Sequence, residues 1–441
     1  MKSDLAWLAL SVVFAAIVTL ALVLGRLTLG SVLFVTAGVV ISVRVAGRMA
    51  IDADRMWLTT LLPLAFIAKM AGAVARFLMV TELYGRGDSF GYYNAGIDFV
   101  HVWRSFNVPH ATAGGAGTRF VDVFTSFLFL PAIPTFLMAF FMFATLSFVG
   151  TVFFYLAFRR WFRDSKHLWL YALFVFFMPS LLFWPSAIGK DAIMVLGLGI
   201  AAYGAARVLE GDYARGAAFA TPGLLLAAGV RAHVAVLVVA GVALALLLSR
   251  RRPGSSAWLG RIVALGVAIT IVTVVGLTAA KNLKLDTSGD GIDEFLAETE
   301  RRTAQGGSVV TGSPVSSPVG FPEATLRVLF RPLPYEAGNP AAMLGAAEST
   351  LLLLVLIARF PHLARNFVRI RHSPYMVFAA VYTLGFIVAF SAIFNLGILA
   401  RQRVQVLPFL LAMLVGLGWG SIASPGPQPL PHSTVGATSP N

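Results

Sequence analysis

Cysteine is absent from all 441 residues of the chain. That absence excludes disulfides, thiolate metal sites and cysteine nucleophiles. Charged residues are also scarce, at 12% of the sequence, which is roughly half of their share in soluble globular proteins. The sequence contains no Walker A loop, dinucleotide fingerprint, HExxH or G-x-S-x-G element. Without these motifs, a cytoplasmic enzyme driven by nucleotides is disfavoured.

The low share of charged residues is matched by a high share of apolar ones. They make up 58% of the chain, its mean hydropathy is +0.81, and apolar runs of about 18 residues or more recur along its length. These runs are continuous and do not alternate with polar residues, which disfavours a membrane β-barrel. The pattern predicts an all-α, polytopic transmembrane helical bundle of about twelve spans. We expect them near residues 5–25, 29–43, 56–80, 128–158, 168–186, 192–209, 217–230, 234–249, 257–280, 341–358, 376–398 and 404–423.

These spans form one integral membrane domain over residues 1–423. The N-terminal run has a single lysine and no clear small-residue cleavage site, so we interpret it as a retained first span. Residues 424–441 are rich in Pro, Ser and Gly and predict a disordered cytoplasmic tail.

The formal net charge of +14 is explained by topology, and nucleic-acid binding is not expected. Basic residues gather in the loops after even-numbered spans, which by the positive-inside rule lie in the cytoplasm together with both termini. They are Arg44, Arg48, Arg55, Arg159, Arg160, Arg163, Lys166, Arg250, Arg251, Arg252, Arg359, Arg365, Arg369 and Arg371. The two long loops, at about 81–127 and 281–340, then face outward. The second begins with an acidic stretch that predicts one short helix, and its Pro/Gly/Ser-rich remainder should be largely irregular.

Most polar side chains that orientation does not explain lie at the outward ends of the spans. A face that holds carboxylates and cations at the membrane edge is a candidate functional site. We take Asp88 as the candidate catalytic residue. The candidate substrate-binding residues are Tyr92, Tyr93, Lys190, Arg231, His233, Arg331, Glu336, Arg401 and Arg403.

Several of these residues have more than one interpretation. Asp88 could remove a proton from a hydroxyl nucleophile, hold a divalent cation or cap a helix that begins there. Lys190 could simply pair with Asp191, and Arg231 with His233 could snorkel to the interface. Arginines on the outer side suit bidentate contact with phosphate. Three further charges fall inside spans, either as functional groups or as a structural pair: Lys69, Arg76 and Glu348.

The segment "GDSFGYYNA" around Asp88 resembles the acidic motif in the first outward loop of the membrane glycosyltransferases of the C superfamily. The chain also resembles bacterial polysaccharide-polymerase-type membrane proteins, and "PSLLFWPSAIGKDAIM", "VRAHVA", "FRPLPYE" and "ARQRVQVLPF" look like segments of uncharacterised actinobacterial proteins of this kind. Two features depart from the superfamily pattern: the acidic loop follows the third expected span instead of the first, and Asp88 is followed by Ser89 instead of a second acid.

The resemblance implies an enzyme of the bacterial cytoplasmic membrane whose active face is extracytoplasmic. Its donor would be a sugar on a polyprenyl phosphate, and its acceptor a glycan or lipid of the cell envelope. Asp88 would act as the base, with Lys190 and the outward arginines as cations for the departing phosphate. No metal ligands are assigned, although Mg²⁺ or Mn²⁺ is compatible with this chemistry, and other envelope-biosynthesis proteins are possible partners.

Three alternatives stay open. The chain could join whole lipid-linked repeat units, as a polymerase does. It could be a transporter or flippase of lipid-linked or small polar substrates, which predicts charges near mid-membrane and broken helices. It could also be a non-catalytic membrane scaffold.

Overall fold

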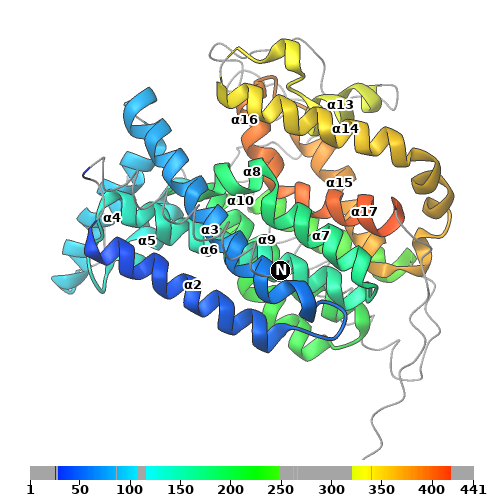
Figure 1. The fold of residues 1–441 in the computed structure, drawn as a ribbon, viewed down its shortest axis with the longest axis horizontal. Coiled ribbons are helices and arrows are strands. Elements are labelled where there is room, and N and C mark those ends of the chain that lie inside the picture. The colour runs from blue at the N-terminus through cyan, green and yellow to red at the C-terminus, as the bar shows by residue number, and fades with distance from the viewer. Residues whose placement is uncertain are drawn as a thin grey trace, which may run out of the picture.

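The fold is known from a computed structural model, which describes residues 28–85, 87–107, 116–248, 320–338 and 340–418, together with the isolated positions 25, 262 and 266. Every regular element in this part of the chain is helical (Figure 1). The helices are α2 (Leu29–Met49), α3 (Arg55–Leu78), α4 (Asp88–Arg104), α5 (Ala116–Phe129), α6 (Phe136–Trp161), α7 (Ser165–Phe177), α8 (Pro179–Phe183), α9 (Lys190–Glu210), α10 (Tyr213–Leu248), α13 (Phe321–Phe330), α14 (Pro340–Phe367), α15 (Pro374–Phe390), α16 (Leu396–Gln402) and α17 (Leu407–Gly418). Short turns of other helical types are η1 (Met79–Tyr84), η2 (Trp184–Ser186), η4 (Pro334–Glu336), η5 (Ile370–His372) and η6 (Arg403–Gln405).

The expected all-α class is confirmed, and several helices are apolar and long enough to cross a membrane. Within the described ranges, six helices meet that criterion singly, and up to eight do if two bent pairs each count as one span. One bent pair is α7 with α8 and η2, at an angle of 51°, and the other is α16 and η6 with α17, at 62°. The expected spans at 5–25 and 257–280, and the tail 424–441, lie outside the described residues. The count of twelve therefore stays a prediction.

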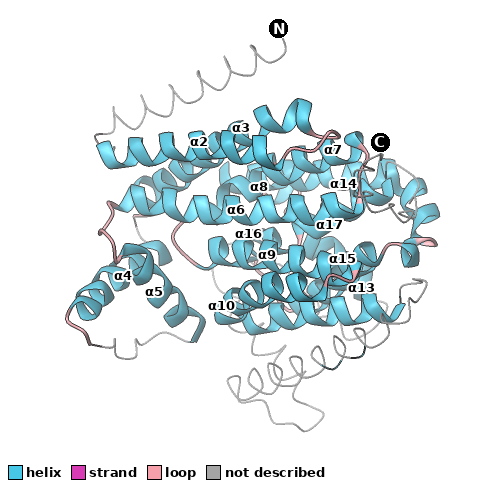
Figure 2. Cartoon of the chain, turned by 90° about the horizontal axis from the view of Figure 1, so that it is seen from below, coloured by secondary structure: helices cyan, strands magenta, loops and turns pink. Residues whose placement is uncertain are grey.

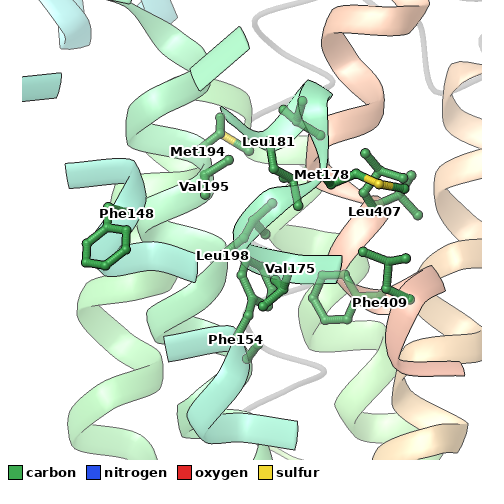
Figure 3. Packing of buried hydrophobic residues seen from close by; sticks show 14 of the residues in the cluster. Phe148, Phe154, Val175, Met178, Leu181, Met194, Val195, Leu198, Leu407 and Phe409 are labelled. Carbon is green, nitrogen blue, oxygen red and sulfur yellow. The ribbon is translucent and has the colours of Figure 1, made fainter. Parts of the chain in front are cut away.

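Helices α6 and α9 are in close backbone contact within the bundle. A Cβ on Gly150 would lie 2.3 Å from the backbone oxygen of Val195, and one on Gly199 would lie 2.1 Å from that of Gly150. Only glycine allows the two backbones to approach this closely, and helices in membranes use small residues in the same way. Around this contact the core is filled by apolar side chains such as Phe154, Leu198 and Phe409 (Figure 3).

The two ends of α9 define the two ends of the bundle, here named the Asp191 end and the Glu210 end. At the Glu210 end, Arg160 at the end of α6 pairs with Glu210. The neighbouring Trp161 stacks on Tyr375 at the start of α15, with ring centroids 6.5 Å apart. Helix α15 therefore begins at the Glu210 end.

Helix α10 changes direction at Arg231, whose backbone leaves the helical range (φ −147°, ψ 90°). Its first arm starts beside the Glu210 end, where Arg207 pairs with Asp212, and packs along α9. Its second arm packs along α15, from His233 against Phe390 towards the start of α15, where Gly241 lies against Phe378. The two arms therefore run in opposite directions. The two arms coincide with the helices expected at 217–230 and 234–249. A single non-helical residue, Arg231, separates the two arms, where a short loop was expected.

Much of what we expected to be outward loop is helical. Within the segment at 81–127, the described residues form η1, α4 and most of α5, and α4 and α5 lie beside each other at one end of the bundle (Figure 2). The Pro/Gly/Ser-rich part of the segment expected at 281–340 was predicted to be largely irregular. This was wrong at α13, a helix that has Pro322 in its first turn. The span expected at 128–158 was also placed too early, since α6 starts at Phe136 with Thr135 as its cap.

The α6–α9 contact gives a stability prediction. Gly199→Val should lower the apparent unfolding temperature in detergent, because overpacking of a tight contact costs about 1–3 kcal/mol or more. The control is Gly47→Val on α2, where an added Cβ meets nothing within 4 Å. Equal effects of the two substitutions would contradict the close helix contact.

Candidate functional site

Charged side chains from four helices meet at the Asp191 end of the bundle. They come from the starts of α4 and α9, from the break in α10 and from α16. We name this group the charge cluster, and it consists of Asp88, Lys190, Asp191, Arg231 and Arg401. The structure thus brings together four of the candidate residues predicted from the sequence and adds Asp191.

Asp191 is the centre of the cluster. Its side chain is only 5% exposed, and the Nε of Arg401 donates a hydrogen bond to its Oδ2. NH1 of Arg231 lies 3.8 Å from its Oδ1. A buried carboxylate requires such partners, because an unpaired charge in this position would cost several kcal/mol. The suggested pairing of Lys190 with Asp191 was wrong, since the Nζ of Lys190 donates to the hydroxyl of Thr118 at 3.0 Å.

Asp88 is the exposed member of the cluster, with 66% of its side chain accessible. It is the first residue of α4, and the cap position belongs to Gly87, so the interpretation of Asp88 as a helix cap was wrong. Its Oδ2 lies 3.4 Å from NH1 of Arg401. The guanidinium of Arg401 therefore bridges an exposed carboxylate and a buried one.

Two contacts hold the start of α4 against the start of α9. The hydroxyl of Ser89 donates to the backbone oxygen of Ile188 at 3.0 Å, and the Tyr92 ring lies 3.2 Å from the place where a Cβ on Gly189 would fall. Asp88 and Tyr92 both belong to α4 and lie one helical turn apart.

The two adjacent tyrosines have different environments. Burial, reinforced by the charge of Asp88, raises the pKa of Tyr92 to about 12, and a hydrogen bond with Thr118 acts in the opposite direction. Tyr92 therefore presents a neutral hydroxyl beside the cluster. Tyr93 turns away and donates to the backbone oxygen of Pro134 at 2.8 Å, and burial raises its pKa as well. Its visible role is to fix α4 to the link between α5 and α6.

Four other candidate residues have their polar contacts elsewhere. The His233 ring packs on Phe390. Arg403 is buried, and its NH1 donates to the backbone oxygen of Leu329 at 2.8 Å and to Ser349 at 2.7 Å. Arg331 and Glu336 pair with each other. Within the described part of the chain, no hydrogen bond or ion pair joins these four to the cluster.

The three charges expected within spans do not pair with one another. Instead, each contacts the bent segment formed by α8 and η2. Lys69 donates to the backbone oxygen of Leu181 at 2.5 Å, and Glu348 accepts from the backbone N–H of Ser180 at 2.5 Å. Arg76 lies 4.9 Å from the ring centre of Trp184 and within electrostatic range of the charge cluster.

Sequence reasoning missed two contributors to the site, Asp191 as its centre and Thr118, and it considered Arg76 only as a charge within a span. Asp191 carried a usable signal, since it follows a glycine and a lysine at the start of an apolar run. Among the described residues, no group of three acidic or histidine side chains converges on one point. A role for Mg²⁺ or Mn²⁺ stays a prediction.

Asp191→Asn should destabilise the fold much more than Asp88→Asn. The first substitution leaves two arginines without a buried counter-charge, at a cost of about 3 kcal/mol. The second removes an exposed ion pair worth at most about 1 kcal/mol. The apparent unfolding temperatures of both variants in one detergent test this difference, and a larger loss for Asp88→Asn would contradict the central position of Asp191.

The Arg331–Glu336 pair predicts a pH dependence. Burial raises the pKa of Glu336, but hydrogen bonds from Arg331 and the Leu333 N–H outweigh burial and hold the pKa below its usual 4.5. A lowered folded-state pKa stabilises the fold above pH 4.5, and this contribution is lost as the pH falls below that value. Glu336→Gln should therefore be about 1 kcal/mol less stable than the wild type at pH 7, and this difference should shrink as the pH falls below 4.5. A difference that persists unchanged to pH 3 would rule the pair out as its source.

Comparison with known proteins yields no match for the chain, neither to a family model, nor to a curated protein, nor to a solved structure. Its function is therefore inferred from the geometry and charge of its own residues.

Proposed function

We propose that the chain is a membrane glycosyltransferase that takes a sugar from a polyprenyl-phosphate donor at the outer face of the bacterial cytoplasmic membrane. The product would be a cell-envelope polysaccharide or glycolipid. One observation carries the proposal: at one end of an apolar bundle, an exposed carboxylate, Asp88, lies 3.4 Å from the guanidinium of Arg401, in a cluster that also holds Lys190 and Arg231.

The charge distribution supports an outward orientation of the Asp191 end. Basic residues at the opposite end, such as Arg48, Arg163 and Lys166, lie at the ends of apolar helices or just beyond them. Arg159 and Arg160 count for less in this respect, because they pair with Asp54 and Glu210. By the positive-inside rule, a surplus of basic residues at the Glu210 end favours the cytoplasm on that side.

The chemistry follows from the positions of Asp88 and Arg401. Asp88 would take the proton of an acceptor hydroxyl while the oxygen of that hydroxyl forms a bond to the anomeric carbon. The bond from that carbon to the phosphate oxygen breaks, and its electron pair leaves with the phosphate. Arg401 uses one N–H on Asp191 and one on Asp88, so that further N–H groups of its five remain for a phosphate. Lys190 and Arg231 would add positive charge beside the leaving group.

Asp191 has a different task in this proposal. It is buried and engaged by two arginines, so it would fix the cations rather than exchange a proton with substrate. The same arrangement would serve a polymerase that joins lipid-linked repeat units, because that reaction also displaces a lipid phosphate.

A specific observation supports a second candidate, a transporter or flippase. Two apolar segments are bent, at 51° and 62°, and buried charges contact both of them: Lys69 and Glu348 at the first, and Arg403 within the second. Interrupted helices with nearby charges are a feature of transporter binding sites. The exposed acid at the bundle end favours the transferase as the first candidate.

Asp88→Asn should abolish transfer while the protein is retained in the membrane, because the amide cannot accept the acceptor's proton. A deletion strain is complemented with the variant or with the wild type, and its lipid-linked glycans are profiled. The variant should leave an under-glycosylated intermediate, and the wild type should not. Asp98→Asn, on the same helix and exposed, is the matched control and should restore the normal profile.

Restoration of the profile by Asp88→Asn at normal abundance would contradict the proposal. Accumulation of a fully glycosylated lipid on the cytoplasmic leaflet would favour the transporter instead.

A further inference from the structure

Arg76 is a cation near the charge cluster to which the proposed function assigns no role. It lies two residues before the end of α3. Its guanidinium is 5.3 Å from the ring centre of Phe183 and 4.9 Å from that of Trp184. Aromatic rings attract a guanidinium, but they do not cancel its charge. The two rings therefore fix the position of Arg76 and leave its charge for another partner.

No carboxylate pairs with Arg76 in the part of the chain that the structure describes. Its one hydrogen bond there is a weak one, from NH1 to the Sδ of Met79 at 3.6 Å. The Nε is buried and unpaired, whereas NH2 is unpaired and not buried. NH2 is therefore the group through which Arg76 can donate to a ligand. A charge without a counter-ion within an apolar bundle is costly, and such charges mark functional sites.

The strongest electrostatic influence on Arg76 is another cation. Arg401 acts on it more strongly than Asp191 or Asp88 does. Both of these carboxylates are already engaged by Arg401. Two guanidiniums that repel each other, with one of them unpaired, are arranged favourably only when an anion joins them.

Inclusion of Arg76 gives the site an excess of positive charge. Its cations become Arg76, Lys190, Arg231 and Arg401, against the two carboxylates of Asp88 and Asp191. The excess persists even when Asp122, which acts on Tyr92, is counted as a third carboxylate. A phosphate diester carries one negative charge, whereas a phosphate monoester carries about 1.5 to 2 at pH 7. The charge of the site therefore suits the monoester better.

We propose that Arg76 binds the phosphate of the lipid carrier together with Arg401, and that it favours the monoester released by transfer over the diester of the donor. NH2 of Arg76 would donate to a phosphate oxygen. When the acceptor oxygen bonds to the anomeric carbon and Asp88 takes its proton, the bond from that carbon to the phosphate oxygen breaks. Its electron pair gives the phosphate its second negative charge, which Arg76 would stabilise.

The inference rests on the proposed function, because it concerns the same phosphate. The surroundings of Arg76 also favour a phosphate on an apolar chain over free phosphate. Phe183 and Trp184, the rings beneath its guanidinium, line a largely apolar cavity of about 470 Å³. An apolar chain therefore has space directly beside the cation.

The test is calorimetric binding of farnesyl phosphate to the purified full-length protein in a non-ionic detergent. Three further probes are the methyl diester of farnesyl phosphate, farnesol and inorganic phosphate. The wild type should bind the monoester more tightly than each of them. Arg76→Gln should weaken binding of the monoester about tenfold, weaken that of the diester less, and leave that of farnesol unchanged.

Two further variants control for damage to the fold. Arg76→Lys keeps the charge without the planar fork, so it should weaken monoester binding only about threefold. Arg55→Gln removes an exposed arginine at the opposite end of the same helix and should change nothing. An equal loss of monoester and farnesol binding in Arg76→Gln would reveal a structural role and overturn the proposal. Inorganic phosphate that binds as tightly as farnesyl phosphate would overturn the lipid as its source.

Arg401→Gln distinguishes failure of this inference from failure of the proposed function. A loss of monoester binding in Arg401→Gln, with none in either Arg76 variant, would overturn the role of Arg76 and leave the proposed phosphate site intact. Unchanged binding in the variants of both arginines would overturn the phosphate site itself. Asp88→Asn should bind the monoester at least as tightly as the wild type, because it removes a negative charge beside the phosphate.

Discussion

A carboxylate cannot remain ionised inside an apolar bundle unless cations accompany it, and Asp191 imposes this condition on the surrounding helices. Arg401 and Arg231 meet it from α16 and α10. Each arrives at a point where its own segment departs from a regular helix: α10 breaks at Arg231, and α16 continues as η6 immediately after Gln402. The irregular backbone of both segments is thus linked to the charge that they must neutralise.

The exposed part of the site depends on this buried pair. Because Asp191 holds the Nε of Arg401, the other end of the guanidinium is directed to Asp88 on α4. Helix α4 is itself fixed to the start of α9 by Ser89 and Tyr92. A buried ion pair therefore sets the distance between the exposed Asp88 and the partly buried guanidinium of Arg401, and the proposed transfer from a phosphate depends on that distance.

The sequence predicted the helical class and the gathering of Asp88, Lys190, Arg231 and Arg401 at one end of the bundle, because hydropathy indicates where each apolar run ends. It could not predict that Arg401 pairs with Asp191, 210 positions away. The hydropathy of one apolar segment does not indicate which other helices pack beside it. The sequence also did not place the helices α4 and α5 within the outward segment expected at 81–127. Gly96 allows α4 to approach Thr125 and Phe129 of α5. Arg331 and Glu336 were grouped with the site by charge alone, yet they satisfy each other.

The central claim is that the charge cluster binds the phosphate of a lipid carrier, and the most direct measurement is lipid binding by native mass spectrometry. A polyprenyl monophosphate and the polyprenol without its phosphate should be compared on the wild type and on Arg401→Gln. We predict that the wild type retains the phosphorylated lipid in preference to the alcohol and that Arg401→Gln loses this preference. Equal retention of both lipids by the wild type, or an undiminished preference in Arg401→Gln, would contradict the account.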